Sequence, residues 1–522
     1  MSTAAPVAPT RNPWRLRFDG PVIAVLIALV LGAIARVVML TTNIARFESD
    51  EAVTGVMAQR ILDGDFPAYF GIQSYQGALE QYLQAPVMAL FPDSPLALRS
   101  VQVALTIVIG VLVYLLGTRI VGSRWAGALA CTLYALGPYY SVIKGVRSHG
   151  GYDGAVIFGL LAVLLALRLR REHSRAPWIA AAIGLCAGLA IWENYLAVYL
   201  LVPAGLWALG TARGSLRRLL PWGAGGLIVG LLPVIGFRLT HGLNPPSGTG
   251  TPPATTFSER MDLLFSPVLG KFLGVPSPEP WVARIVPAAL VLTIALGALG
   301  AAVWVRRWGI WDTVTLRTAR RQPIDIVLVA FIITPFIYAA STYTWFAGEP
   351  RYLFTLYPFL AIGVSAAVFA FRGTPRLVIA GVVVALSVTL LVTNMRQVQM
   401  TGGEISSADG GLIHTEDMPQ VVEVMRATGA DSAYADYWVA NVLQFHGGDA
   451  ISVASTSVDH FPSISARVDA DANPAIVSTV PGGADGTRAM LTSTGRTFTE
   501  TPAGRFVVFT DINPPWRRPA AG

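Results

Sequence analysis

Long apolar segments alternate with short polar ones along the first three quarters of the chain. Eleven of them approach the length needed to cross about 30 Å of hydrocarbon, at roughly 21–42, 98–118, 125–143, 153–169, 177–192, 194–210, 221–238, 283–305, 325–343, 352–371 and 377–395. This pattern predicts a polytopic α-helical membrane protein with about eleven transmembrane helices. The segment 21–42 is full length and has no clear cleavage site, so we expect an uncleaved first span.

The segment between the first two spans, residues 43–97, has a different pattern. In "DEAVTGVMAQRILDG" apolar residues recur at near-helical spacing from Val53 to Ile61, and "GALEQYLQAPVMALF" repeats this spacing from Leu79 to Val87. We predict two amphipathic helices lying at the membrane surface. The stretch "FPAYFGIQSYQG" between them predicts a loop that can contact a polar ligand.

The tail, residues 396–522, is richer in Asp, Ser, Thr and Gly, and it lacks an apolar segment long enough to span a membrane. "DMPQVVEVMRATGA" predicts a helix with a Gly stop, "SAYADYWVANVLQF" a strand leading into a helix, and "RFVVFTD" a strand. Together these elements predict a small α/β domain. Within the loop 240–282, the Pro/Ser-rich "NPPSGTGTPPATT" predicts a mobile segment.

Basic residues are distributed unevenly between the loops. Alternate loops carry the arginines: 119 and 124, then 168–175, 213–218, 306–321, and 372 with 376. The positive-inside bias therefore places the N-terminal tail, 1–20, in the cytoplasm, and the segments 43–97, 240–282 and 396–522 outside it. We expect a multi-pass protein of the cell membrane whose net charge of +7 reflects topology and not a nucleic-acid partner.

Composition agrees with this class, since 53% of the residues are hydrophobic and only 13% are charged. The two cysteines, Cys131 and Cys186, both fall in apolar segments and give no disulfide framework. We find no HExxH motif, P-loop or dinucleotide fingerprint, so we expect neither a nucleotide cofactor nor a metal. A divalent cation at Asp50 and Glu51 stays open.

An acidic cluster directly follows the first span. The stretch "RFESDEAVTG" places Glu48, Asp50 and Glu51 within four positions. Solvated loop charge is one interpretation. The cluster also opens the longest loop and precedes a predicted helix, on the side where other uncommon polar residues emerge, which favours a functional site.

Several stretches occur in an order that is similar to a known family. An Asp-Glu pair after the first span is followed by "YFGIQSYQGALEQYLQAPVMALF", "SPLALRSVQVAL", "GVRSHGGYDGAVIFGLLAVLLALRLRR", "EPRYLFTLYPFLAI" and "YADYWVANVLQF". Over most of residues 20 to 450 the chain resembles the protein O-mannosyltransferase-like (family 39) glycosyltransferases of the GT-C superfamily, which also resemble the aminoarabinose-lipid A transferases.

The resemblance implies a GT-C fold and an inverting transfer of a sugar from a polyprenyl-phosphate donor to an extracytoplasmic acceptor, which is a protein, a glycolipid or a cell-wall glycan. It places the family's first-loop acid at Asp50, with Glu51 beside it, and the family's arginine of the second helix at Arg99. Lys144, Arg147 and His149 occupy a region where relatives keep polar residues.

The chemistry needs two kinds of side chain. A carboxylate must take the proton of the acceptor hydroxyl, a general-base role that we assign to Asp50, with Glu51 as its neighbour. Basic groups must neutralise the departing phosphate, and the candidates near the outer ends of spans are Arg99, Lys144, Arg147, His149 and Arg351. As an alternative to binding phosphate, the arginines and the lysine could place their charged ends at the membrane interface. The alternative for His149 is a purely structural role.

Candidates for binding the sugar or acceptor are Tyr69, Tyr75, Glu80 and Trp345. Aromatic residues are also expected at a membrane interface, and Glu80 could face solvent. We expect Glu193, in a tight turn between two spans, to be ordinary turn polarity.

Two other function classes remain. A transporter or lipid flippase without glycosyl transfer would place charges near mid-bilayer, whereas here they collect at the outer ends of the spans. A catalytically silent scaffold would use the tail to bind envelope partners. The donor sugar stays open between mannose, arabinose, another pentose and an amino sugar.

Overall fold

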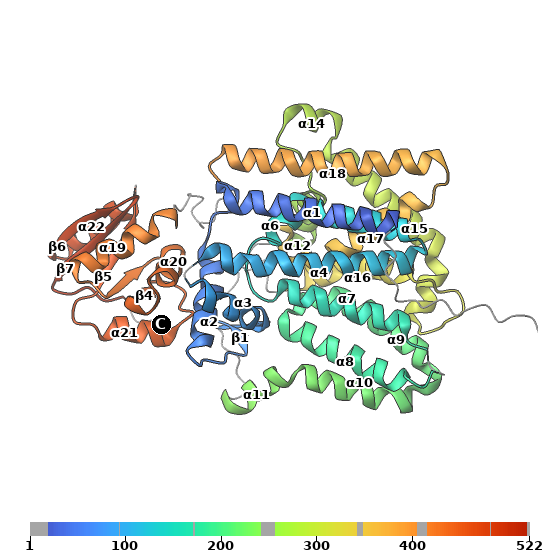
Figure 1. Cartoon of the computed structure of the whole chain (residues 1–522), viewed down its shortest axis with the longest axis horizontal. Coiled ribbons are helices and arrows are strands. Elements are labelled where there is room, and N and C mark those ends of the chain that lie inside the picture. Colours follow the sequence, from blue (N-terminus) through green and yellow to red (C-terminus); the bar gives the residue numbers. More distant parts are fainter. Residues whose placement is uncertain are drawn as a thin grey trace, which may run out of the picture.

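The computed structural model describes residues 19–92, 94–170, 173–241, 256–341, 348–403, 415–480 and 482–518. Long helices run side by side, and a smaller domain containing a β-sheet lies at one end of them (Figure 1). Residues 244–255 of the predicted mobile segment lie outside the described residues.

Each of the eleven predicted spans is mainly helical over its described residues, with short breaks such as 136–138 and 286–287. The helices are α1 (Gly20–Thr41), α4 (Pro95–Val121), α5 (Arg124–Ala135) with α6 (Tyr139–Lys144), α7 (Tyr152–Arg168), α8 (Ala176–Glu193), α9 (Val198–Ala212), α10 (Leu216–Gly230) with α11 (Leu232–His241), α15 (Ala288–Val314), α16 (Ile324–Ala340), α17 (Tyr357–Phe369) and α18 (Thr374–Met400). A 3-10 turn, η5 (Pro350–Leu356), leads into α17. Short helices α12 (Phe257–Leu263), α13 (Leu269–Leu273) and α14 (Pro280–Ile285) precede α15.

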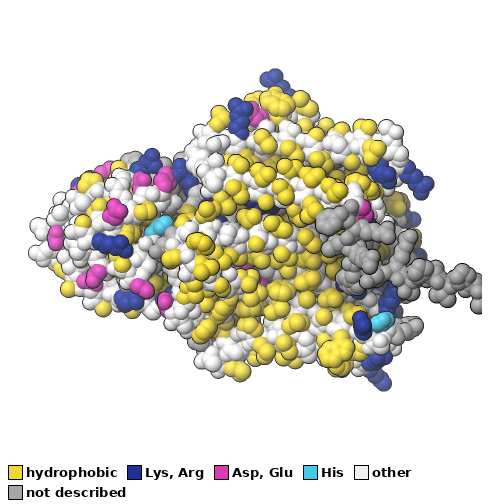
Figure 2. Space-filling view, in the orientation of Figure 1, with side chains coloured by type: hydrophobic (Ala, Val, Ile, Leu, Met, Phe, Trp, Pro, Cys, Tyr) yellow, Lys and Arg dark blue, Asp and Glu magenta, His cyan; other side chains and the backbone are white. Residues whose placement is uncertain are grey.

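The surface of this bundle suits a lipid environment. Seven stretches of the described chain are long and apolar enough to cross a membrane, and the most apolar window of α15 has no residue buried against protein. Hydrophobic side chains cover the visible face of the bundle, while charged ones gather on the sheet domain and at the opposite ends of the helices (Figure 2). The predicted polytopic membrane architecture is confirmed.

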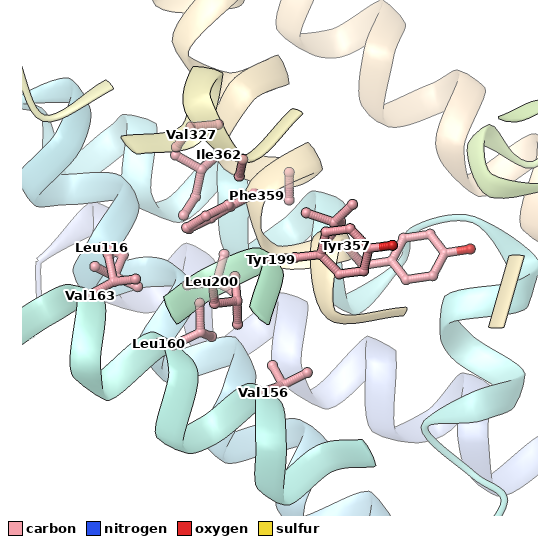
Figure 3. Packing of buried hydrophobic residues seen from close by; sticks show 14 of the residues in the cluster. Leu116, Val156, Leu160, Val163, Tyr199, Leu200, Val327, Tyr357, Phe359 and Ile362 are labelled. Carbon is pink, nitrogen blue, oxygen red and sulfur yellow. The ribbon is translucent and has the colours of Figure 1, made fainter. Parts of the chain in front are cut away.

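The interior of the bundle is a continuous apolar cluster. Leu116 of α4, Leu160 of α7, Leu200 of α9, Val327 of α16 and Phe359 of α17 are buried together (Figure 3). Lipid is as apolar as leucine, so close packing, and not exclusion from water, holds these helices together. Their packing fixes where the helix ends, and hence the site, are placed.

The first loop contains the two predicted helices, α2 (Ser49–Leu62) and α3 (Leu79–Leu90), with a hairpin of β1 (Tyr69–Phe70) and β2 (Gln73–Gly77) between them. The membrane-surface placement is wrong for α2. Val56 belongs to an apolar cluster shared with Phe445 of the sheet domain, and Val53 packs with Phe70 of the hairpin. Protein therefore covers both apolar faces of α2.

The C-terminal domain, described over residues 415–480 and 482–518, is a five-stranded sheet flanked by helices. Its elements are α19 (Met418–Thr428), β3 (Ser432–Ala435), α20 (Tyr437–Gly447), β4 (Ser452–Ser455), α21 (Pro462–Ala470), β5 (Ala475–Thr479), α22 (Gly483–Ser493), β6 (Thr497–Ala503) and β7 (Phe506–Asn513). The strand order is β4-β3-β5-β7-β6, with β4, β3 and β5 parallel and β7 antiparallel to both of its neighbours. The predicted α/β domain is confirmed, including the helix that stops at Gly429, whose φ is +72°.

Candidate active site

Three consecutive residues at the start of α2 have different partners: Ser49 and Asp50 bond to Tyr437 of α20, and Glu51 bonds to Arg99 of α4. The Ser49 hydroxyl donates to the backbone carbonyl of Tyr437 (2.5 Å) and accepts from the Asn441 amide (2.7 Å). The Asp50 side chain is half-buried, and its Oδ1 accepts a hydrogen bond from the Tyr437 hydroxyl (2.5 Å). Glu51, the next residue, is fully buried.

Glu51 forms a buried ion pair with Arg99 of α4. Arg99 donates to both carboxylate oxygens, from Nε at 2.7 Å and from Nη2 at 2.5 Å, and Glu51 also accepts the Ser148 backbone N–H at 3.2 Å. Arg99 further donates to the carbonyls of Ala45 and Arg46, both at 2.9 Å. Four of the five guanidinium N–H bonds thus point to protein acceptors, so the contacts give Arg99 a structural role. Its predicted binding of phosphate stays a prediction.

Glu48 lies at the centre of a second buried network. Its Oε1 accepts a hydrogen bond from Arg147 and lies 2.6 Å from Nε2 of His149, whose Nδ1 is 2.5 Å from the Lys144 ammonium. Since an ammonium only donates, Nδ1 of His149 accepts and Nε2–H donates to Glu48. Burial and the Lys144 charge lower the pKa of His149 to about 4. Burial alone would raise the pKa of Glu48, but Arg147 and His149 outweigh it and hold that pKa well below its usual range.

One group among the described residues has the geometry to hold a metal ion. Ligand atoms of Glu48, Glu51 and His149 lie within 4.8 Å of one another. Arg147 and Arg99 already neutralise the two carboxylates, so a cation would compete with two guanidinium groups. Asp50 is not a member of this group, which differs from the Asp50 and Glu51 pair considered from the sequence.

Two of the five predicted basic residues, His149 and Arg351, lie close enough to interact electrostatically with the half-buried Asp50. Asp50 acts electrostatically on His149 and Arg351, and Arg351 acts on Lys144. Arg351 donates from Nε to Glu349 Oε2 at 3.1 Å, and the Tyr140 hydroxyl donates to the same oxygen at 3.3 Å. Arg351, which is far from Asp50 in the sequence, thus brings positive charge to this accessible carboxylate.

The predicted sugar-binding residues lie in different places. Tyr75 is half-buried, and Asp50 and Arg351 both act electrostatically on it, so it borders the site. Tyr69 is buried, with its ring edge-to-face against Phe237 at 5.0 Å. Trp345 lies outside the described residues.

Two buried acids bind the beginnings of helices. Glu80 accepts the backbone N–H groups of Asp153 (3.0 Å) and Gly154 (3.1 Å) at the start of α7, while Glu193 accepts that of Leu79 (3.1 Å) at the start of α3. Both satisfy N–H groups that have no partner within their own helix. The interpretation of Glu193 as ordinary turn polarity is wrong, because this side chain is fully buried.

Sequence reasoning missed Tyr437 and gave Glu48 and Glu349 no role. Tyr437 is the first residue of α20, directly after Asp436, whose side chain accepts the Trp438 N–H at 2.7 Å as an N-cap. The Asp-Tyr start of that helix is visible in "YADYWVANVLQF". Its partner Asp50 is 387 positions away, and a single sequence gives no sign of that contact.

Comparisons with known proteins agree with this architecture. Residues 77–237 match the family model described as dolichyl-phosphate-mannose-protein mannosyltransferase. That range contains Arg99, Lys144, Arg147 and His149, and it ends before Arg351. A comparison with curated proteins gives no match.

Solved structures with the same arrangement have low sequence identity. ArnT from Cupriavidus metallidurans bound to undecaprenyl phosphate gives a TM-score of 0.60 at 12% identity, covering 94% of this chain and 97% of that chain. The apo state of the same protein gives 0.59 at 13% identity with the same coverage. The helical bundle and the C-terminal domain of this chain therefore have the same fold as ArnT from Cupriavidus metallidurans.

Proposed function

We propose that this protein is a membrane glycosyltransferase that moves a hexosyl or pentosyl group from a polyprenyl-phosphate donor to an extracytoplasmic acceptor. The family match over residues 77–237 and the likeness to ArnT support this class of reaction. In this proposal the N-terminus is cytoplasmic, and the first loop and the C-terminal domain lie on the opposite side.

Asp50 acts as the general base. It takes the proton of the acceptor hydroxyl while that oxygen attacks the anomeric carbon, and the bond from that carbon to the phosphate oxygen breaks with its electron pair leaving on phosphate. The attack comes from the face opposite the phosphate, so the configuration inverts. A positioned base of this kind contributes about 10² to 10⁴-fold to the rate.

Lys144 and Arg351 neutralise the negative charge that grows on the departing phosphate. Arg147 and His149 bind Glu48 and so help to position the basic surface formed by Lys144 and Arg351. Tyr75 borders the sugar. We propose that Arg99 and Glu51 support α2 and do not contact the donor, because their hydrogen bonds are directed at protein partners.

The observation that carries the proposal is the half-buried Asp50 carboxylate with the Arg351 guanidinium near it and Lys144 near Arg351. Oδ2 of Asp50 accepts no hydrogen bond from the residues that the structure describes, so it is available to an acceptor hydroxyl. A channel or carrier does not need a general base placed next to basic groups that can bind a phosphate.

Mass spectrometry of lipid-linked sugars and envelope glycans tests the proposal. Cells without the protein, and cells carrying Asp50→Asn, should accumulate a polyprenyl-phosphate sugar and lack one envelope product. Asp65→Asn is the matched control, since Asp65 is an exposed acid of the same loop that pairs with Arg60 at 2.6 Å. Unchanged lipids and glycans in cells without the protein would refute the transferase, whereas a normal product with Asp50→Asn would refute the assigned base.

A further inference from the structure

The C-terminal domain contributes one side chain to the candidate active site. We propose that Tyr437 is a positioning residue for Asp50, so that the site is complete only when this domain is docked on the first loop. The inference rests on the proposed function of Asp50. Tyr437 itself contacts the base and not the donor phosphate.

Three hydrogen bonds between α2 and α20 fix the position of Tyr437. Its backbone carbonyl accepts from Ser49, Asn441 one turn later donates to the same Ser49 hydroxyl, and Gln59 near the end of α2 donates to the Phe445 carbonyl at 3.2 Å. Gly55 allows this close approach, because a Cβ there would lie 2.4 Å from the Phe445 ring. These contacts hold the backbone of Tyr437 in place, so its phenol has a fixed position relative to Asp50.

The donor and the acceptor can be assigned in each hydrogen bond of the Tyr437 hydroxyl. A phenol has one proton, and the carboxylate at 2.5 Å is its strongest acceptor. Burial and the Asp50 charge raise the pKa of Tyr437, so the phenol stays protonated. Nε2 of His460 lies 3.4 Å from the phenol oxygen and must then donate to it. Burial lowers the pKa of His460 to about 4, so His460 is neutral at neutral pH.

This arrangement gives the two carboxylate oxygens of Asp50 different roles. Oδ1 is occupied by Tyr437, which holds the carboxylate in one orientation and leaves Oδ2 for the acceptor hydroxyl. A hydrogen bond donated to a carboxylate also favours its ionised form, which is the form that acts as a base. Removing the phenol proton donor should therefore loosen the base and require a higher pH for activity.

The test compares Tyr437→Phe with Tyr434→Phe in the full-length protein in liposomes. Tyr434 lies in β3 of the same domain and donates to Asp469 at 2.7 Å, so the control loses the same group bonded to the same type of acceptor. The donor is the lipid-linked sugar that accumulates in Asp50→Asn cells, and release of polyprenyl phosphate is measured across pH.

With Tyr437→Phe we expect kcat to fall about tenfold, KM to change less than about twofold, and the acid limb of the kcat/KM profile to move up by about one pH unit. Tyr434→Phe should match the wild type. The other groups that face Asp50, namely His149, Tyr75 of β2, Tyr152 of α7 and Arg351 of η5, are the same in both variants. The shift therefore reports the lost hydroxyl.

An unchanged kcat and pH profile for Tyr437→Phe would overturn the inference while leaving the proposed function intact. If Tyr437→Phe does not accumulate, His460→Phe carries the test, since it removes the donor to the phenol and should shift the profile in the same direction by less. If the wild type transfers no sugar, the carboxylate of Asp50 is followed by infrared spectroscopy across pH, and its signal is identified by subtracting the spectrum of Asp50→Asn. This measurement still shows whether the Tyr437 hydroxyl favours the ionised form of Asp50.

Discussion

Asp50 and Glu51 are neighbouring acids in the same turn of the same helix, and their surroundings differ in every respect. Asp50 is half-buried and accepts one side-chain hydrogen bond, from Tyr437. Glu51 is fully buried and accepts three hydrogen bonds, two from Arg99 and one from the Ser148 backbone. A rotation of about 100° along the helix thus separates the proposed base from a carboxylate that is bonded on all sides to protein.

Charge balance explains the division. Burying a carboxylate is costly unless a partner with good geometry compensates it, and Arg99 provides such a partner for Glu51. A fully compensated carboxylate is a poor base, because its lone pairs are occupied. Oδ2 of Asp50 accepts no hydrogen bond within the described part of the chain, which is what the proposed base requires.

The largest expected effect is the loss of activity in Asp50→Ala. Transfer should fall about 10² to 10⁴-fold without loss of folded protein, as measured by release of polyprenyl phosphate and by the melting midpoint. Added formate should restore part of the activity, since a small carboxylate can occupy the vacated space and accept the proton. Failure of formate, azide and acetate alike would indicate that Asp50 binds substrate and does not act as a base.

Glu51→Ala should act on stability instead. It leaves Arg99 buried and unpaired, which costs about 3 to 5 kcal/mol, so the melting midpoint and the yield of folded protein should both drop, and formate should not restore activity. The double variant Glu51→Gln with Arg99→Met serves as the control because it removes both charges. It should be more stable than Glu51→Ala, and a Glu51→Ala protein that melts like the wild type would contradict the structural role.

The same contrast shows what a single sequence can predict. The spans follow from the length of the apolar segments, and the helices α2 and α3 follow from their periodicity. Periodicity shows which face of a helix is apolar but not what covers it, so α2 was predicted on the membrane, whereas it lies against Phe445 of the C-terminal domain and Phe70 of the hairpin.

The site was predictable where the chemistry requires a residue type. The resemblance points to Asp50, and it also points to the region of Lys144, Arg147 and His149. The position of Arg351 near the outer end of a span makes it a further candidate, and the structure links Arg351 electrostatically to Lys144. Glu193 was misjudged, because an acid in a turn reads the same whether it is exposed or bonded to the start of another helix. Tyr437 was missed since no local pattern links it to the first loop.

Glu48 extends the comparison, because it belongs with Glu51 among the compensated acids, and its partner His149 makes that assignment testable by pH. Above about pH 6.5 His149 is neutral in both the folded and the unfolded chain. Between about pH 6.5 and its folded pKa of about 4, only the unfolded chain takes up the proton, so the free energy of unfolding falls as pH falls. The slope is about 1.4 kcal/mol per pH unit.

Replacing His149 by Gln removes this contribution. The difference in melting midpoint between pH 7 and pH 5 should be smaller in His149→Gln than in the wild type, by the equivalent of about 2 kcal/mol. His173→Gln is the control, since His173 is exposed and lies outside the network. Equal pH slopes in His149→Gln and the wild type would mean that His149 takes up its proton over the same pH range in the folded and the unfolded protein, which would contradict its burial as a neutral partner of Glu48.

Ser49 gives the smallest effect and separates docking of the C-terminal domain from the two acids beside it. Ser49→Ala removes the hydrogen bonds to the Tyr437 carbonyl and from Asn441, which should cost about 1 kcal/mol of stability and, because α20 loosens, reduce kcat about twofold without a change in the pH profile. Backbone hydrogen exchange in α20 should rise slightly, and Ser100→Ala, whose hydroxyl donates to the Ala97 carbonyl within α4, provides the control. A loss of activity as large as that of Asp50→Ala would show that Ser49 acts on the substrate, and α2 would then carry two reacting side chains in one turn.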